Sequence, residues 1–177
     1  NSIYRGSVSI KFNIVKGTIR QAIDKENAKM LEKPYTGEAI TLPDEEIRQL
    51  APIRAYTGAG NPPYTVTYAK NTDAGKASVK LMGKDYLHGS ATVYFTITPK
   101  SVSSLKITTG DKQLSYNAGN PVYLELKKVT DGDKELKSGK DYIYSYTNAD
   151  KKGTACLTVT GVGNYTGTRY IYYKIES

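Results

Sequence analysis

The chain has 177 residues, a length that suits one large or two ordinary domains. It contains 16 tyrosines and 16 glycines but only 2 phenylalanines and no tryptophan, and long apolar helical runs are missing. This composition favours an all-β protein, because tyrosine packs well in half-buried strands. A single cysteine excludes an intrachain disulfide.

The formal net charge of +8 favours anionic partners, such as a cell-wall polymer of the teichoic-acid type. The densest group of lysines, within 127–140, surrounds a predicted hairpin, and we interpret it as a solvated face. Nucleic-acid sites cluster their charge among aromatic residues, so no nucleic-acid binding is expected. With no signal peptide and no long apolar run, the chain is interpreted as a fragment of a longer protein, and this fragment is not expected to insert into a membrane.

Residues 4–14 alternate between apolar and polar side chains, which predicts a strand with one buried face. The apolar set is Val8, Ile10, Phe12 and Ile14. We interpret residues 1–15 as the last strand of a preceding repeat or as a strand that caps the following domain. As an alternative, residues 4–14 pair with a strand of another molecule.

Residues 18–33 have the propensity of a helix. The matching stretch of a second copy, 101–111, instead favours a strand followed by a turn. Because the two stretches occupy the same place in the repeat, we predict a strand, a turn and a strand in both.

Two regions differ between the copies. Residues 43–50 start with a proline and an acidic run, which predicts a short helix. The corresponding residues 129–136 carry an Asp-Gly pair, which predicts a β-hairpin. The insertion 44–63 of the first copy ends in a loop rich in glycine and proline, and it is the better candidate for a specialised surface.

A turn with tyrosine and glycine, followed by an alternating strand, occurs three times in the chain. The three copies contain Tyr4, Tyr86 and Tyr165, and they repeat with a period of about 80 residues. The repetition predicts two tandem domains, at 16–99 and 100–177, joined through a short segment near Pro99.

Residues 116–175 resemble the Ig-like tandem repeats of large secreted and cell-wall proteins of Gram-positive, often gut, bacteria. The motifs are Gly139-Lys140-Asp141-Tyr142, Gly153-Thr154-Ala155 and the turn from Gly161 to Gly167. Residues 35–97 follow the pattern less closely, since Asn61-Pro62-Pro63-Tyr64 replaces the Gly-x-Asp-Tyr entry. The resemblance implies two tandem antiparallel Ig-like β-sandwich domains, with β-grasp-like surface repeats as the alternative. It offers no catalytic residues.

Few residues of the chain fit catalysis or metal binding. Cys156 is expected on the exposed face of its strand as a surface thiol, and the only histidine that could activate it is His88. Asp131, Asp133 and Glu135 are spaced two apart, but the glycine between the first two falls where a hairpin needs it. We therefore expect no enzyme activity, no cofactor and no metal site.

The closing strands carry tyrosines that are predicted to face outward: Tyr94, Tyr170 and Tyr172. Such residues can stack on sugar rings, although cross-strand packing is the simpler interpretation. The leading hypothesis is a non-enzymatic extracellular module, a spacer or adhesion scaffold of a bacterial cell-surface or secreted protein. Its partners would be flanking domains of a larger chain. The alternative is a polysaccharide-binding module that uses these tyrosines or the insertion 44–63.

Overall fold

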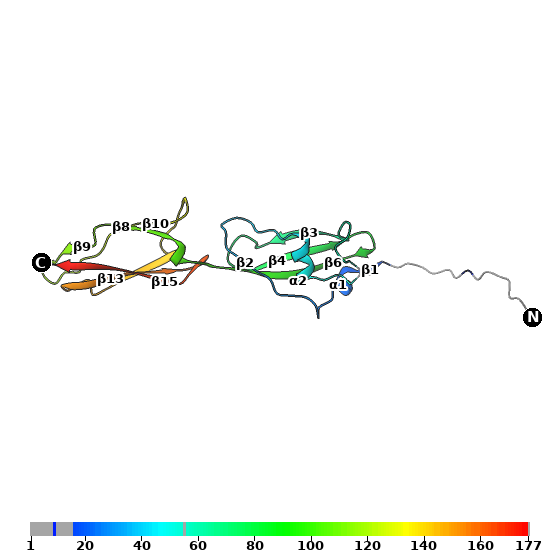
Figure 1. Ribbon diagram of the computed structural model, residues 1–177, viewed down its shortest axis with the longest axis horizontal. Helices are drawn as coiled ribbons and strands as arrows, with labels where there is room; N and C mark the ends of the chain where they lie inside the picture. Colours follow the sequence, from blue (N-terminus) through cyan, green and yellow to red (C-terminus); the bar gives the residue numbers. More distant parts are fainter. Residues whose placement is uncertain (1–8, 10–15, 55, 177) are drawn as a thin grey trace, which may run out of the picture.

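The computed structural model describes residues 9, 16–54 and 56–176. Strands dominate this part of the chain and helices are few, which confirms the prediction of an all-β protein. The strand predicted at 4–14 lies outside the described residues, apart from Ser9. We refer to residues 16–99 as repeat 1 and to residues 100–176 as repeat 2. Figure 1 shows the strands of the two repeats following one another along the long axis of the molecule.

Repeat 1 contains a four-stranded sheet, a two-stranded sheet and two short helices. Its strands are β1 (Gly17–Thr18), β2 (Glu32–Pro34), β3 (Tyr64–Ala69), β4 (Gly75–Gly83), β5 (Leu87–His88) and β6 (Ser90–Thr98). Its helices are α1 (Ile19–Ala22) and α2 (Asp44–Leu50). The larger sheet has the order β2-β6-β4-β3, and β1 pairs with β5.

Repeat 2 contains the same two sheets and a third one with three strands. Its elements are β7 (Lys100–Ser101), the 3-10 helix η1 (Val102–Ser104), β8 (Lys106–Thr109), β9 (Gln113–Ser115), β10 (Leu126–Asp131), β11 (Lys134–Glu135), β12 (Tyr142–Thr147), β13 (Gly153–Gly161), β14 (Tyr165–Thr166) and β15 (Thr168–Glu176). The larger sheet has the order β12-β13-β15-β9, β14 pairs with β7, and the additional sheet has the order β11-β10-β8.

The larger sheets of the two repeats therefore match strand for strand. Each has an antiparallel core and one edge strand, β2 or β9, that runs parallel to the closing strand. The prediction of purely antiparallel sheets is wrong at these edges. In each repeat the edge strand precedes the antiparallel core and its partner closes the repeat, so the strands and loops between them serve as the long crossover that a parallel pair needs.

The strand-turn-strand prediction for residues 18–33 is wrong at its start. The chain forms the short helix α1, in which the Thr18 side chain accepts a hydrogen bond from the Gln21 backbone N–H. Ile19 anchors this turn, since it is fully buried. Only Glu32–Pro34 forms the second strand. In repeat 2 the prediction is also wrong at its start, where Val102–Ser104 form the 3-10 helix η1. The two predicted strands follow it as β8 and β9, separated by residues 110–112.

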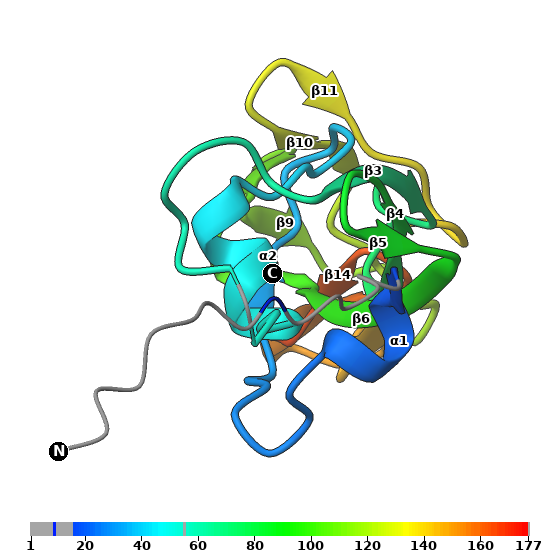
Figure 2. The same ribbon diagram turned by 90° about the vertical axis from the view of Figure 1, so that its right-hand side faces the viewer.

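The two repeats cover the inner face of the larger sheet differently. In repeat 1 the cover includes α2, whose Ile47 and Leu50 are buried, and the predicted helix is confirmed. In repeat 2 it includes the sheet of β8, β10 and β11, and the predicted hairpin is confirmed, with Gly132 at a φ of 57°. Figure 2, viewed along the long axis, shows α2 to one side and β11 extending past the outline of repeat 1.

Alternate residues of the central strands build the interior. The fully buried set is Ala77, Val79 and Leu81 of β4 and Ala155, Leu157 and Val159 of β13. Cys156 does not fit the expectation of a surface thiol, because it is buried. Its register places it opposite Thr147 and Tyr172 on the two neighbouring strands, where cross-strand neighbours lie close enough to pack against it.

Candidate functional site

The three tyrosines singled out from the sequence lie on the outer faces of the closing strands. Tyr170 and Tyr172 are 60% and 62% exposed on the same face of β15, and Tyr94 is 51% exposed on β6. Tyr94 and Tyr172 occupy equivalent positions, because they pair with Ser78 and Cys156 in matching strands. The fold thus brings Tyr170 and Tyr172 together and leaves Tyr94 in the other repeat.

Open hollows flank the equivalent tyrosines. Beside Tyr94 one hollow is lined by Met30, Leu31, Lys76, Phe95 and Thr96, and beside Tyr172 another is lined by Lys112, Gln113, Thr154, Tyr173 and Lys174. The Lys76 ammonium lies over the Tyr94 ring, 3.9 Å from its centre. This cation occupies a ring face on which a sugar would stack, so Tyr170 and Tyr172 are the better platform of the three.

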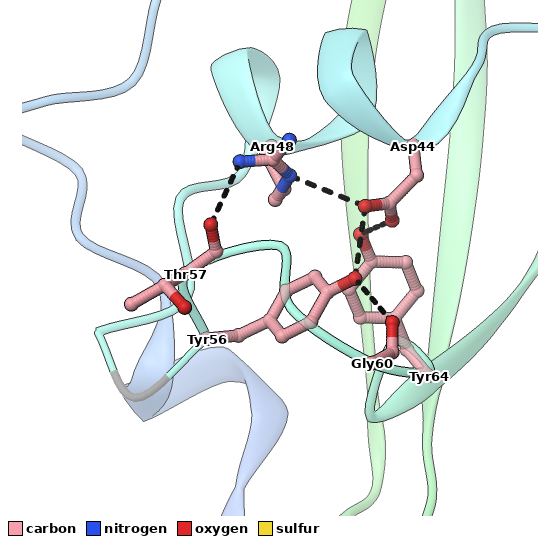
Figure 3. A network of polar contacts seen from close by, with 6 residues as sticks. All are labelled: Asp44, Arg48, Tyr56, Thr57, Gly60 and Tyr64. Carbon is pink, nitrogen blue, oxygen red and sulfur yellow. Dashed lines mark hydrogen bonds and ion pairs between the residues drawn. The ribbon is translucent and has the colours of Figure 1, made fainter.

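The insertion 44–63 is organised around one carboxylate (Figure 3). The Tyr64 hydroxyl donates to Asp44 Oδ1 at 2.5 Å, and the Tyr56 hydroxyl donates to Asp44 Oδ2 at 3.0 Å. Arg48 Nε donates to the same Oδ2 at 3.2 Å, and its Nη1 donates to the Thr57 carbonyl at 3.3 Å. The carboxylate at the start of α2 therefore ties the loop to the helix and to strand β3.

The electrostatics of this cluster stabilise the hydrogen bonds that Tyr56 and Tyr64 donate to Asp44. Burial, followed by the Asp44 carboxylate, raises the pKa of Tyr64 well above its usual value and raises the pKa of Tyr56 as well. Both phenols therefore stay protonated and keep donating to Asp44. From the sequence the acidic run predicts only a helix start. The i,i+4 spacing of Asp44 and Arg48 is the available signal for part of this network.

A second polar cluster joins the two repeats. Asn164 lies in the turn between β13 and β14, and its side chain reaches the hairpin between β3 and β4 of repeat 1. The Ala74 backbone N–H donates to Asn164 Oδ1 at 2.7 Å, and Asn164 Nδ2 donates to Asp73 Oδ1 at 2.8 Å. The Asn164 carbonyl also accepts from the Lys100 backbone N–H at 2.9 Å. One residue thus bonds to repeat 1 and to the first strand of its own repeat.

Tyr35 forms the other side of the junction. Its ring packs edge to face against Tyr165 with centres 5.7 Å apart, and both residues are buried. Lys134 Nζ donates to the Tyr35 hydroxyl at 3.2 Å, and this bond raises the pKa of Lys134. The Tyr165 hydroxyl in turn donates to Asp131 Oδ2 at 3.2 Å. Tyr35 of repeat 1 is therefore enclosed by residues of repeat 2.

The connection between the repeats is one residue long. β6 ends at Thr98 and β7 begins at Lys100, with only Pro99 between them. The proline ring restricts φ at this position, which removes freedom from the linker. The buried side chains of both repeats belong to one contiguous cluster. The linker, the Asn164 contacts and the Tyr35 contact together restrict bending and twisting at the junction.

Sequence reasoning singled out the turn from Gly161 to Gly167 but missed what it binds. The available signal was the difference between the copies, since Tyr86 stands in the turn of repeat 1 where Asn164 stands in repeat 2. Asp73 carried no signal of its own, because its partner is 91 positions away.

No family model matches the chain, and a search of the curated proteins gives no match. Within the described residues no group of three or more His, Cys, Asp or Glu side chains is arranged to hold a metal ion. The same part of the chain has no helix with the length and apolar character needed to cross a membrane.

Proposed function

We propose that this chain is a non-enzymatic spacer of an extracellular bacterial protein, built from two Ig-like β-sandwich domains whose relative orientation is fixed. In this role it holds flanking domains of a larger chain away from a surface. The extracellular location rests on the resemblance of residues 116–175 to surface repeats. The observation that carries the mechanical part is the pair of hydrogen bonds from the Asn164 side chain to repeat 1.

A spacer needs length and resistance to bending. The end-to-end placement of the two repeats supplies length (Figure 1). Resistance to bending comes from contacts at separate points around the linker: the Asn164 bonds, the Tyr35–Tyr165 pair and the Lys134–Tyr35 bond. The bond between Ala74 and Asn164 joins neutral groups and contributes about 0.5–1.5 kcal/mol, and the aromatic pair contributes a similar amount. The bonds to Asp73 and from Lys134 involve a charged group. Their sum favours a single orientation over a freely jointed pair.

The test is a distance measurement across the junction. Spin labels are placed at Thr67→Cys in β3 and Ser145→Cys in β12, two exposed positions, in a Cys156→Ser background. We expect one narrow distance distribution for the parent chain and a broader one for Asn164→Ala. The matched control is Asn61→Ala, an exposed asparagine of the repeat 1 loop, which should leave the distribution narrow. A broad distribution in the parent chain would refute the spacer proposal.

Polysaccharide binding is the second candidate. Its specific support is the exposure of Tyr170 and Tyr172 on one face of β15, next to the hollow lined by Lys112 and Thr154. Affinity gels that contain soluble polysaccharides provide the test. Retention that is lost in the Tyr170→Ala, Tyr172→Ala variant but kept in Tyr94→Ala would support binding at this platform. Equal mobility of all three proteins in every gel would count against it.

A further inference from the structure

The end of repeat 2 that points away from the junction has the same architecture as the end of repeat 1 that receives Asn164. Tyr35 and Tyr116 both follow the parallel edge strand, and their N–H groups donate to the carbonyls of Thr98 (2.9 Å) and Glu176 (2.7 Å). Tyr116 is therefore the counterpart of Tyr35.

The hairpins at the two ends also correspond. The N–H groups of Ile40 and Val122 donate to the carbonyls of Asn71 (2.8 Å) and Ala149 (2.7 Å). Both hairpins begin with a residue at positive φ, 55° at Lys70 and 58° at Asn148, and end at a glycine that also has positive φ. Counting from these anchors, Asp73 and Ala74 correspond to two lysines, which are Lys151 and Lys152.

We call Tyr116, Lys151 and Lys152 the distal end. Both lysines are exposed, and Tyr116 is half-buried whereas Tyr35 is 5% exposed beneath repeat 2. The Lys152 ammonium lies 5.3 Å from the centre of the Tyr116 ring. At the junction the corresponding cation over Tyr35 is Lys134, which comes from the other repeat. The distal end therefore keeps the shape of the docking surface but is basic where repeat 1 presents Asp73.

We propose that the distal end docks the turn of a further repeat that carries a carboxylate where repeat 2 carries Asn164. This inference rests on the proposed spacer function and specifies how the next unit is chosen. The Asn164 amide suits Asp73, because its Nδ2 donates to that carboxylate. Opposite Lys151 an amide N–H would face another donor, whereas a carboxylate accepts from the ammonium and from the backbone N–H of Lys152.

The chain's other turn does not meet this requirement. In repeat 1 the position of Asn164 is occupied by Tyr86, whose phenol offers neither the amide nor the carboxylate. Asp85 of that turn has a φ of 58° and corresponds to Gly163, so the backbone of the two turns is alike. A second native copy of this chain is therefore not the partner, because Tyr86 stands where the carboxylate is needed.

The test joins two whole copies, with residues 17–177 of the second copy following Ser177 of the first. Because Gly17 corresponds to Lys100, this fusion reproduces the spacing of the native junction. Position 86 of the second copy is changed to Asp or, as the matched control, to Lys. Spin labels at Ser145→Cys of the first copy and Thr67→Cys of the second, with Cys156→Ser in both, report the distance across the new junction.

We expect the Tyr86→Asp fusion to give a narrow distance peak whose share of the molecules is at least about fivefold larger than in the Tyr86→Lys fusion. Lys151→Asp in the first copy should reverse the preference, so that the Tyr86→Lys fusion becomes the ordered one. The native Tyr86 fusion should remain broad.

Equal distributions for all combinations, or an ordered native fusion, would overturn the inference. If the label pair within one copy still gives a narrow distance distribution, only the proposed requirement for a carboxylate fails. If that distribution is broad as well, the spacer proposal fails together with it.

Discussion

The two repeats share a frame, which consists of the larger sheet and its closing turn. They differ in the cover, which is the set of elements packed on the inner face of that sheet. Repeat 1 places α2 and its insertion over the inner face, and repeat 2 places a second sheet there. Strand order, the parallel edge strand and the turn closed by a hydrogen bond from the Gly83 or Gly161 N–H are common to both. At the junction Asn164 and Tyr165 come from the shared turn, whereas Lys134 and Asp131 come from the cover of repeat 2. Both parts of repeat 2 therefore contribute to the contact with repeat 1.

The change of cover also alters which tyrosines are exposed. In β3 the inner positions hold Tyr64, Val66 and Tyr68, and Tyr64 is 2% exposed beneath the Asp44 cluster. In β12 the counterpart of Tyr64 is Tyr142, which is also buried, and the counterpart of Val66 is Tyr144, which is 46% exposed. Val66 is half-buried, so the two covers differ most at this middle position of the strand.

The largest expected effect comes from the shared interior. Leu81→Ala in repeat 1 and Leu157→Ala in repeat 2 each remove the leucine of a matching central strand, β4 or β13, and both side chains are 0% exposed. In the register Leu81 corresponds to Val159 and Leu157 to Val79. Each should lower the free energy of unfolding by about 3 kcal/mol, because a cavity remains after the transfer energy is lost. Urea titration measures this cost. Costs that differ by more than about 2 kcal/mol would show that the two frames are not energetically equivalent.

The closing turns provide the next comparison. A Cβ at Gly161 would lie 2.6 Å from the Thr166 backbone N, whereas at Gly83 the nearest atom, the His88 backbone N, is 3.0 Å away. Gly161→Ala should therefore lower the free energy of unfolding by about 3 kcal/mol and Gly83→Ala by about 1 kcal/mol. Backbone must move in both cases, and it must move further at Gly161. Chemical denaturation of the two variants gives the order, and a reversed order would contradict the packing argument.

The third variant affects the cover of repeat 1 alone. Asp44→Ala leaves the hydroxyls of Tyr56 and Tyr64 without their acceptor, and repeat 2 has no equivalent of the insertion that this carboxylate holds. We expect a loss of about 1–3 kcal/mol in stability. Faster amide hydrogen exchange should appear around residues 56–64 but not in β10 and β11. Uniform acceleration across both repeats would indicate that the cover is not an independent feature.

Alkaline pH should produce the smallest loss of stability, and both repeats should contribute to it. Burial, followed by Asp44 at Tyr64 and by Asp131 at Tyr165, raises the pKa of both phenols above their ordinary value. The folded state then favours the protonated phenol, so its contribution is complete below about pH 10 and is lost as the pH rises further. Each phenol should account for about 1 kcal/mol by about pH 11.

Thermal unfolding between about pH 8 and pH 11 measures this loss. Tyr64→Phe and Tyr165→Phe should each flatten the decline, since neither ring can then ionise. Tyr170→Phe, which changes an exposed tyrosine, is the matched control and should leave the decline unchanged. A decline of the same slope in all variants would assign the effect to other groups.

The sequence by itself determined the parts of this protein that depend on neighbours in the chain. Alternation of side chains predicted the closing strands, the acidic run after Pro43 predicted α2, and the Asp131-Gly132 pair predicted the hairpin. The repetition of one turn also marked the two matching frames. These features depend on local geometry, since strand alternation and turn chemistry act within a few residues.

Only the tertiary structure decided the remaining features. The parallel edge strands, the burial of Cys156 between Thr147 and Tyr172, and the Asp44 cluster all depend on residues far apart in the chain. The bond between Asp73 and Asn164 spans 91 positions, and no local pattern in either segment distinguishes a bonded amide from a solvated one. Such pairs form only when both repeats have folded and met, so no local pattern can predict them.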